Sequence, residues 1–156
     1  MNPQPSTNHS MMKTQWIDND PKTLAIIFEP GDEVIAGLTK AAVEFKLSAS
    51  HFTAIGAFSD VILGYFNLEK KDYKRIPISE QTEVLSLVGD IARHKDKPKI
   101  HAHVVVGKSD GTAWGGHLVE AHVRPTLEVI LTESPVHLHR KTDSETGLAL
   151  IDLTKS

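Results

Sequence analysis

Three histidines in this chain have the residue type and spacing to hold a metal ion. His101 and His103 stand two residues apart in an apolar segment with the composition of a buried strand. Successive side chains of a strand alternate between its faces, so both imidazoles project to one side, about 6.5 Å apart along the backbone. Two imidazoles at this spacing can converge on one ion with Zn–N distances of roughly 2.0–2.1 Å. The pair alone is suggestive only, because a hydrogen-bonded, half-buried histidine is the commoner state.

His117 adds a third imidazole if the register of a hairpin allows it. The Asp-Gly pair inside Ser109–Thr112 predicts a tight turn and an antiparallel return strand. With a two-residue loop, His117 would point to the wrong face of that strand. One extra residue, either a β-bulge at Gly115-Gly116 or a third loop residue, would place His117 opposite His103. The spacing therefore predicts a metal site formed by His101, His103 and His117.

Neighbouring polar residues are not predicted to be ligands or catalytic groups. Glu120 and His122 follow His117 at odd offsets, so in a regular strand they lie on its opposite face. His137 and His139 form a second His-x-His pair, but the two basic residues that follow it would disfavour a nearby cation. An exposed edge strand is the expected setting of that pair. No residue is assigned as a catalytic base.

The composition limits the chemistry of any metal site. The chain has 156 residues, nine histidines and no cysteine, so thiolate ligands and disulfides are excluded. A transition metal must therefore be bound through nitrogen or oxygen. Zinc is the expected ion, and nickel, copper and iron stay open because imidazole suits several of these metals.

The chain length and hydropathy predict one soluble domain. A length of 156 residues suits a single domain with a real core, and no apolar run approaches the roughly 20 residues of a spanning helix. Residues 1–20 are predicted to be a disordered tail without signal-peptide features, and 21–156 to be the folded domain. We expect a cytoplasmic protein without a membrane partner.

The elements that must position these histidines are one helix and many strands. Thr23–Phe28 is predicted to be a strand, and Asp32 to cap a helix whose apolar stripe runs from Val34 to Phe45. Further strands are expected at His51–Ile55, Val61–Phe66, Tyr73–Ile78, Thr82–Ile91, Ile100–Val106, His117–Val123, Leu127–Thr132 and Val136–Arg140. One helix cannot supply the crossovers of a parallel array. The predicted fold class is α/β of the α+β type, with a mainly antiparallel sheet packed against one principal helix.

The charge distribution argues against a nucleic-acid-binding face. The formal net charge is −3, whereas such a face relies on Lys and Arg to neutralise phosphates. Two basic clusters, Lys70–Arg75 and Arg93–Lys99, have the composition of solvated loops. Direct DNA binding therefore has weak support.

An ordered set of motifs resembles the plants and prokaryotes conserved (PPC) domain family, stand-alone prokaryotic type. These motifs are Gly31–Val34, Ile55–Phe66, Glu83–Ile91, His101–Gly107, Asp110-Gly111, Gly115–Leu118 and Pro125–Val129. The resemblance, over roughly residues 23 to 153, implies a compact α/β fold, a homotrimer and a metal bound by the three histidines. Plant relatives add AT-hook segments, but no Arg-Gly-Arg-Pro occurs here. Their protein-interaction segment resembles Thr82–Ile91, although strand core is the favoured explanation of that stretch.

Two functions of different classes follow from these observations. The first is a trimeric PPC-domain protein that is expected to bind zinc and to have a regulatory or DNA-associated role, with other proteins as partners. The alternative is a metal-dependent enzyme acting on a small molecule through the open coordination position of a three-histidine zinc site. The absence of an assignable base favours the first.

Overall fold

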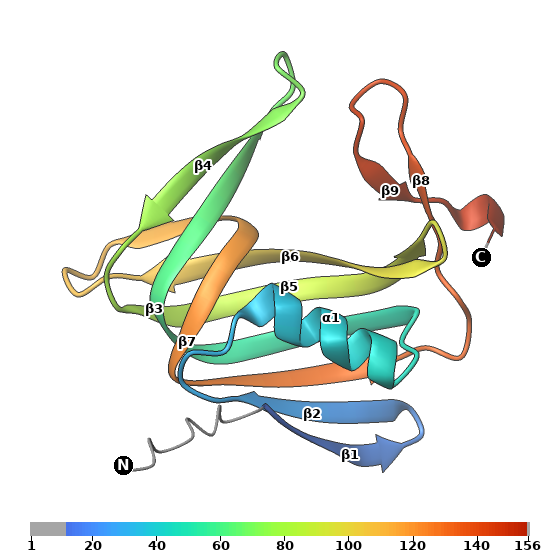
Figure 1. Cartoon of the computed structure of the whole chain (residues 1–156), viewed down its shortest axis with the longest axis horizontal. Helices are drawn as coiled ribbons and strands as arrows, with labels where there is room; N and C mark the ends of the chain where they lie inside the picture. The colour runs from blue at the N-terminus through green and yellow to red at the C-terminus, as the bar shows by residue number, and fades with distance from the viewer. Residues whose placement is uncertain (1–11, 156) are drawn as a thin grey trace, which may run out of the picture.

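The computed structural model describes residues 12–155 and contains one seven-stranded antiparallel sheet with a helix across one face (Figure 1). The strand order is β1-β2-β7-β6-β5-β3-β4, and β7 also pairs with β3. The elements are β1 (Lys13–Asn19), β2 (Lys22–Phe28), α1 (Val34–Glu44), β3 (Ala49–Asn67), β4 (Asp72–Ile78), β5 (Thr82–His94), β6 (Lys97–Gly107), β7 (Ala113–Glu133), β8 (Arg140–Thr142), β9 (Ala149–Ile151) and a 3₁₀ turn at Leu153–Lys155. The predicted α+β architecture is confirmed. The broader term α/β, which is normally used for folds with a mainly parallel sheet, describes this chain less well, because its strands pair antiparallel.

Helix α1 covers the sheet with the predicted apolar stripe. Four of its side chains are buried: Val34, Leu38, Ala41 and Ala42. They pack into one core with large side chains from the strands, including Phe28, Phe52 and Phe58. The cap is Glu33 rather than the predicted Asp32, since the Glu33 carboxylate accepts the N–H groups of Ile35 (3.0 Å) and Ala36 (2.6 Å). This cap satisfies two of the helix's free N-terminal donors.

Two strands are longer than the sequence predicted. The segments His51–Ile55 and Val61–Phe66 belong to the single strand β3, and the two segments predicted between 117 and 132 belong to β7. Gly56 lets β3 continue, because its φ of 152° accompanies a shift in register there. A Cβ atom at Gly56 would lie 2.2 Å from the Thr126 carbonyl oxygen, so only glycine fits. As a result, β3 and β7 run beside each other along most of their length (Figure 1).

The N-terminal boundary differs from the prediction. Strand β1 lies inside the segment 1–20 for which a disordered tail was predicted, and residues 1–11 lie outside the described part of the chain. The largely polar sequence of β1 did not predict a strand, because β1 lies at the edge of the sheet and most of its side chains are exposed. It pairs with β2, and the Trp16 ring packs edge-on against Phe45 at 5.6 Å.

The predicted strand Val136–Arg140 is also wrong. Residues 134–139 form an irregular crossing segment, and β8 begins only at Arg140. The crossing segment is fixed by backbone bonds from Leu138 N–H to the Ser48 carbonyl (3.1 Å) and from Arg93 N–H to the Leu138 carbonyl (2.8 Å). The His137 ring meets the Ser48 hydroxyl at 2.5 Å. The second His-x-His pair therefore lies on a coil rather than on an edge strand.

The two basic clusters lie at turns, as expected of solvated loops. One spans the β3–β4 turn and the other the β5–β6 turn. Arg75 is 3.7 Å from Glu120, and Arg93 is 3.8 Å from Asp96, so acidic neighbours offset part of the charge. In the described part of the chain, no helix has the length and apolarity to cross a membrane.

Candidate metal centre

The β6–β7 hairpin places His117 directly opposite His103. The extra residue needed for this register is in the loop. Lys108 N–H donates to the Thr112 carbonyl and Gly111 N–H to the Lys108 carbonyl, each at 2.9 Å, which leaves a three-residue loop with Gly111 at φ 81°. The pairing of β6 with β7 has no bulge at Gly115-Gly116. The predicted register is therefore reached by the longer loop.

The three predicted histidines lie together. One ligand nitrogen of each can be chosen so that all three atoms lie within 4.8 Å of one another. The ring centroids of His101, His103 and His117 are 5.1 to 5.5 Å apart. A tetrahedral zinc ion would space its nitrogen ligands about 3.3 Å apart, so modest side-chain rotations complete the coordination. Among the described residues, no other group of His, Asp or Glu side chains converges in this way.

The electrostatics keep two of these imidazoles neutral. Burial, followed by the charges of His101, His103 and Lys99, lowers the pKa of His117 to about 4. Burial and the charge of Arg140 lower the pKa of His101, against an opposing effect of Asp90. The buried Nδ1 atom of His117 has no hydrogen-bond partner. Neutral imidazoles with a free lone pair are the form that binds a metal, so the donor set fits a divalent transition ion.

Asp90 and Arg140 support this site, and the sequence analysis did not find them in that role. Asp90 is paired with His101 across β5 and β6, and its Oδ2 atom lies 3.9 Å from His101 Nδ1. Its other oxygen accepts a hydrogen bond from Arg140 Nη2. The Arg140 side chain is only 5% exposed, and Nη1 donates to the Ala149 carbonyl at 2.7 Å. Asp90 therefore lies between His101 and the β8–β9 hairpin, and its negative charge acts on the His101 imidazole without a direct hydrogen bond.

Glu120 lies on the same face of β7 as His117, contrary to the regular-strand expectation. The pairing with β3 skips Val119, and this irregularity reverses the alternation of the residues that follow. Even so, Glu120 is directed to Arg75 and His122 to Asp60, with a His122 Nδ1 to Asp60 Oδ1 distance of 2.8 Å. The convergent group of three histidines therefore includes neither Glu120 nor His122.

The Asp60–His122 pair predicts a pH-dependent stability. The hydrogen bond to Asp60 raises the pKa of His122 above 6.5, and the charges of Asp60, Glu120 and Glu33 add to this. Burial would raise the pKa of Asp60, but hydrogen bonds from His122 and Ser59 lower it below 3.8. The contribution of His122 to the free energy of unfolding is complete below pH 6.5, and it is lost as the pH rises through the raised pKa of this histidine. The Asp60 contribution is present above pH 3.8 and is lost as pH falls through its lowered pKa.

We expect Asp60→Asn to lower the free energy of unfolding by at most about 1 kcal/mol near pH 5.5, because both side chains are over a third exposed. At pH 8.5 the loss should be smaller. Urea unfolding at the two pH values measures it, and His122→Gln should reproduce the pattern. A loss that does not change with pH would contradict the pairing.

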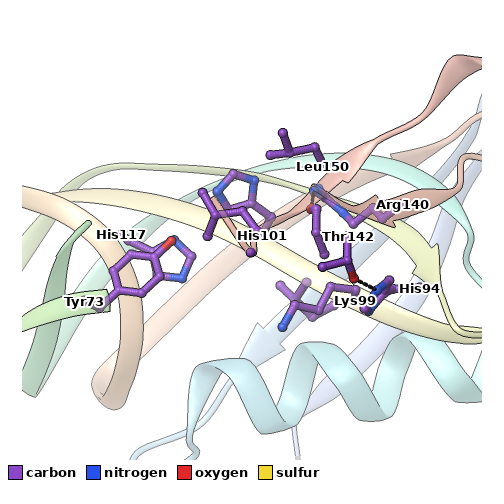
Figure 2. A pocket seen from close by; sticks show the side chains of 12 residues that line it. Tyr73, His94, Lys99, His101, His117, Arg140, Thr142 and Leu150 are labelled. Carbon is purple, nitrogen blue, oxygen red and sulfur yellow. Dashed lines mark hydrogen bonds between the residues drawn. The ribbon is translucent and has the colours of Figure 1, made fainter. Parts of the chain in front are cut away.

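A cavity of about 310 Å³ opens beside the metal centre. It is bordered by His101 and His117, by Tyr73 from β4, and by the β8–β9 hairpin, including Leu150. Figure 2 shows Tyr73 in front of His117 on one side and Arg140 on the other side of His101. The Tyr73 and His117 ring centroids are 4.8 Å apart. An ion held by the three histidines would therefore border this partly open cavity on the side of His101 and His117, whereas His103 is exposed to solvent.

Comparisons with known proteins identify one family and several solved structures that are similar to this chain. The sequence matches the Plants and Prokaryotes Conserved (PCC) domain, written PPC above, over residues 17–135. The chain is similar to a plant- and prokaryote-conserved protein from Pyrococcus horikoshii, with 30% identity, a TM-score of 0.79 and coverage of 91% of this chain and 94% of that one. It is also similar to a metal-containing protein from Archaeoglobus fulgidus, with 31% identity, a TM-score of 0.77 and coverage of 91% and 98%.

Two further similarities concern other kinds of protein. A candidate DNA-binding protein from Bacteroides thetaiotaomicron shares 25% identity with a TM-score of 0.87, over 93% of this chain and 99% of that one. The bifunctional protein GlmU of Synechococcus sp. (strain JA-3-3Ab) is 28% identical over 129 residues, which cover 81% of this chain and 20% of that protein. The chain thus spans about a fifth of the length of the curated relatives it matches.

Proposed function

Since the chain belongs to the Plants and Prokaryotes Conserved domain family, we propose that it is a homotrimeric, zinc-binding protein with a regulatory role. The observation that carries this proposal is the convergence of His101, His103 and His117 within 4.8 Å. The similar protein from Archaeoglobus fulgidus, which contains a metal, supports it. When bound, zinc would supply a Lewis-acidic centre with one coordination position left for a further ligand. The test is the metal content per chain after purification without chelator, where about one ion per chain is expected.

The outer face of the sheet supports self-association. Large apolar side chains are exposed there on four neighbouring strands: Ile55, Leu85, Val88, Val105 and Ile130. Cross-strand pairs place Val88 beside His103 and Ile130 beside Thr53, so these side chains share the face opposite the core. Apolar patches of this kind mark interaction sites on soluble proteins. A ring of three copies would repeat one such contact three times.

We expect the native chain to have three times its 17.2 kDa mass in solution, and Leu85→Asp to lower that mass to one chain. The new carboxylate would be buried without a partner in each of the three contacts, which is strongly unfavourable. Leu68→Asp, at the exposed β3–β4 turn, is the matched control and should leave the trimer intact. Light scattering after size exclusion measures the mass. A monomeric native chain, or a trimeric Leu85→Asp chain, would contradict the proposal.

A metal-dependent enzyme is the second candidate function, and the cavity beside His101 and His117 favours it. The lining offers one imidazole outside the metal group, His94, and its Nε2 atom is paired with the Thr142 hydroxyl at 3.2 Å. The lining includes no carboxylate, and burial raises the pKa of the Tyr73 phenol, which therefore stays protonated at neutral pH. The site supports binding and polarisation of a ligand better than proton abstraction.

A DNA-associated role has less physical support than binding of a metal and a partner. The chain carries a net charge of −3, and its basic clusters lie at two separate turns, β3–β4 and β5–β6. The structural similarity to a candidate DNA-binding protein motivates this role. A protein or a small molecule is therefore a better-supported partner than DNA.

A further inference from the structure

The cavity beside the metal centre has a wall that the family match does not include. That match ends at residue 135, whereas β8 and β9 begin at Arg140 and Ala149. The hairpin they form is held against β5 by the Arg140–Asp90 ion pair, and Arg140 also donates to the Ala149 carbonyl across the hairpin itself. This C-terminal part of the chain therefore turns an exposed metal site into a bounded pocket.

The charge inside this pocket is positive. Its lining includes Lys99 and Arg140 but no aspartate or glutamate. Asp90 neutralises Arg140 from outside the lining. Lys99 lines the cavity together with His101 and His117, and it makes no hydrogen bond or ion pair with the described residues. Its ammonium group is thus a free cation close to the metal ligands, and a divalent ion would add to the positive field.

The rest of the pocket is apolar and small. Ile100 on β6 lines the cavity, and the hairpin contributes Leu148 and Leu150. Figure 2 shows Leu150 beside His101. The volume of about 310 Å³ is at the lower limit of small-molecule sites. An anion that fills it needs a short apolar body, because a fully hydrated inorganic ion would leave the leucine side chains without a contact.

We propose that this pocket binds a small organic acid whose carboxylate occupies the open metal position beside Lys99, with its short apolar body against Leu148 and Leu150. The inference rests on the proposed metal site, and it names the ligand of that site. Arg140 acts as a positioning residue, since its nitrogens are committed to Asp90 and Ala149 or are buried.

The test uses the full chain loaded with Co²⁺, whose visible absorption reports changes in coordination. Its metal content is measured first. Butyrate should change the spectrum and bind roughly 16-fold more tightly than acetate, because its two additional CH₂ groups contribute about fourfold each when buried. Butyramide, which has the same shape without the charge, should not compete. Inorganic phosphate should bind more weakly than butyrate.

Lys99→Met should weaken butyrate binding at least about tenfold while the cobalt content stays the same, since one charge-assisted contact is lost. Lys97→Met, two residues earlier on β6 and outside this pocket, is the matched control and should bind butyrate as the native chain does. A protein that holds cobalt but shows no response to butyrate overturns this inference and leaves the metal proposal standing. Equal affinity for phosphate, acetate and butyrate, or an unaffected Lys99→Met chain, would also overturn it. A chain that takes up no metal overturns both proposals.

Discussion

The metal content of the His117→Ala chain should fall from about one ion per chain to nearly none. His117 supplies the only ligand from β7, and without it two imidazoles from a single strand remain. Even the loss of a residue that only orients a ligand typically lowers metal affinity 10–100-fold, so the loss of a ligand should exceed about 100-fold. Elemental analysis and a competition titration with a chromophoric chelator measure the two quantities.

His122→Ala is the control for this prediction. His122 lies on the same strand, is similarly half-exposed and is bound to Asp60 rather than to the histidine group. Its loss should leave the metal content unchanged. The circular dichroism of His117→Ala should also stay native, because the core between α1 and the sheet contains none of the three histidines. Full metal content in the His117→Ala chain would remove the proposed site.

The sequence could predict the strand that carries the site but only offer alternatives for its partner strand. The alternation in β6 is complete: Ala102 and Val104 are buried, while His103 is exposed. An alternating pattern shows which side chains share a face, because successive side chains of a strand point to opposite faces. The register of His117 depended on whether the loop has two or three residues, and local sequence permits both. Only the pairing of His103 with His117 decides between them.

The features that the sequence could not predict all depend on distant pairings. Strand β1 is polar because it is an edge strand, so it carries no alternating signal. The strand β3 continues past Gly56 because β7 packs closely there. Arg140 meets Asp90, 50 residues away, through the crossing segment that precedes β8. Residue types and local spacing contain no information about which of many charged residues become such partners.

The Asp90→Ala chain should unfold with a free energy lower by about 2–3 kcal/mol. The substitution leaves the Arg140 guanidinium, 5% exposed, without its counter-charge, and removal of one partner from a buried ion pair is strongly destabilising. The Asp90 side chain is 30% exposed, so the loss should lie at or below the lower end of the roughly 3–5 kcal/mol that removing one partner of a fully buried pair costs. For a chain of this size the melting temperature should fall by roughly 4–12 °C. Thermal unfolding of the chelator-treated protein measures the change without a contribution from the metal.

A double substitution separates the charge effect from the loss of packing. Asp90→Leu with Arg140→Met removes both charges and keeps apolar volume, so it should be more stable than Asp90→Ala alone, since an unpaired buried charge costs more than a missing pair. It should also hold metal less tightly than the native chain, because His101 has then lost the carboxylate 3.9 Å from its Nδ1 atom. Asp90 would thus affect stability through its contact with Arg140 and metal affinity through its proximity to His101. If the double variant is as unstable as Asp90→Ala, the ion pair is not what holds the β8–β9 hairpin over the metal centre.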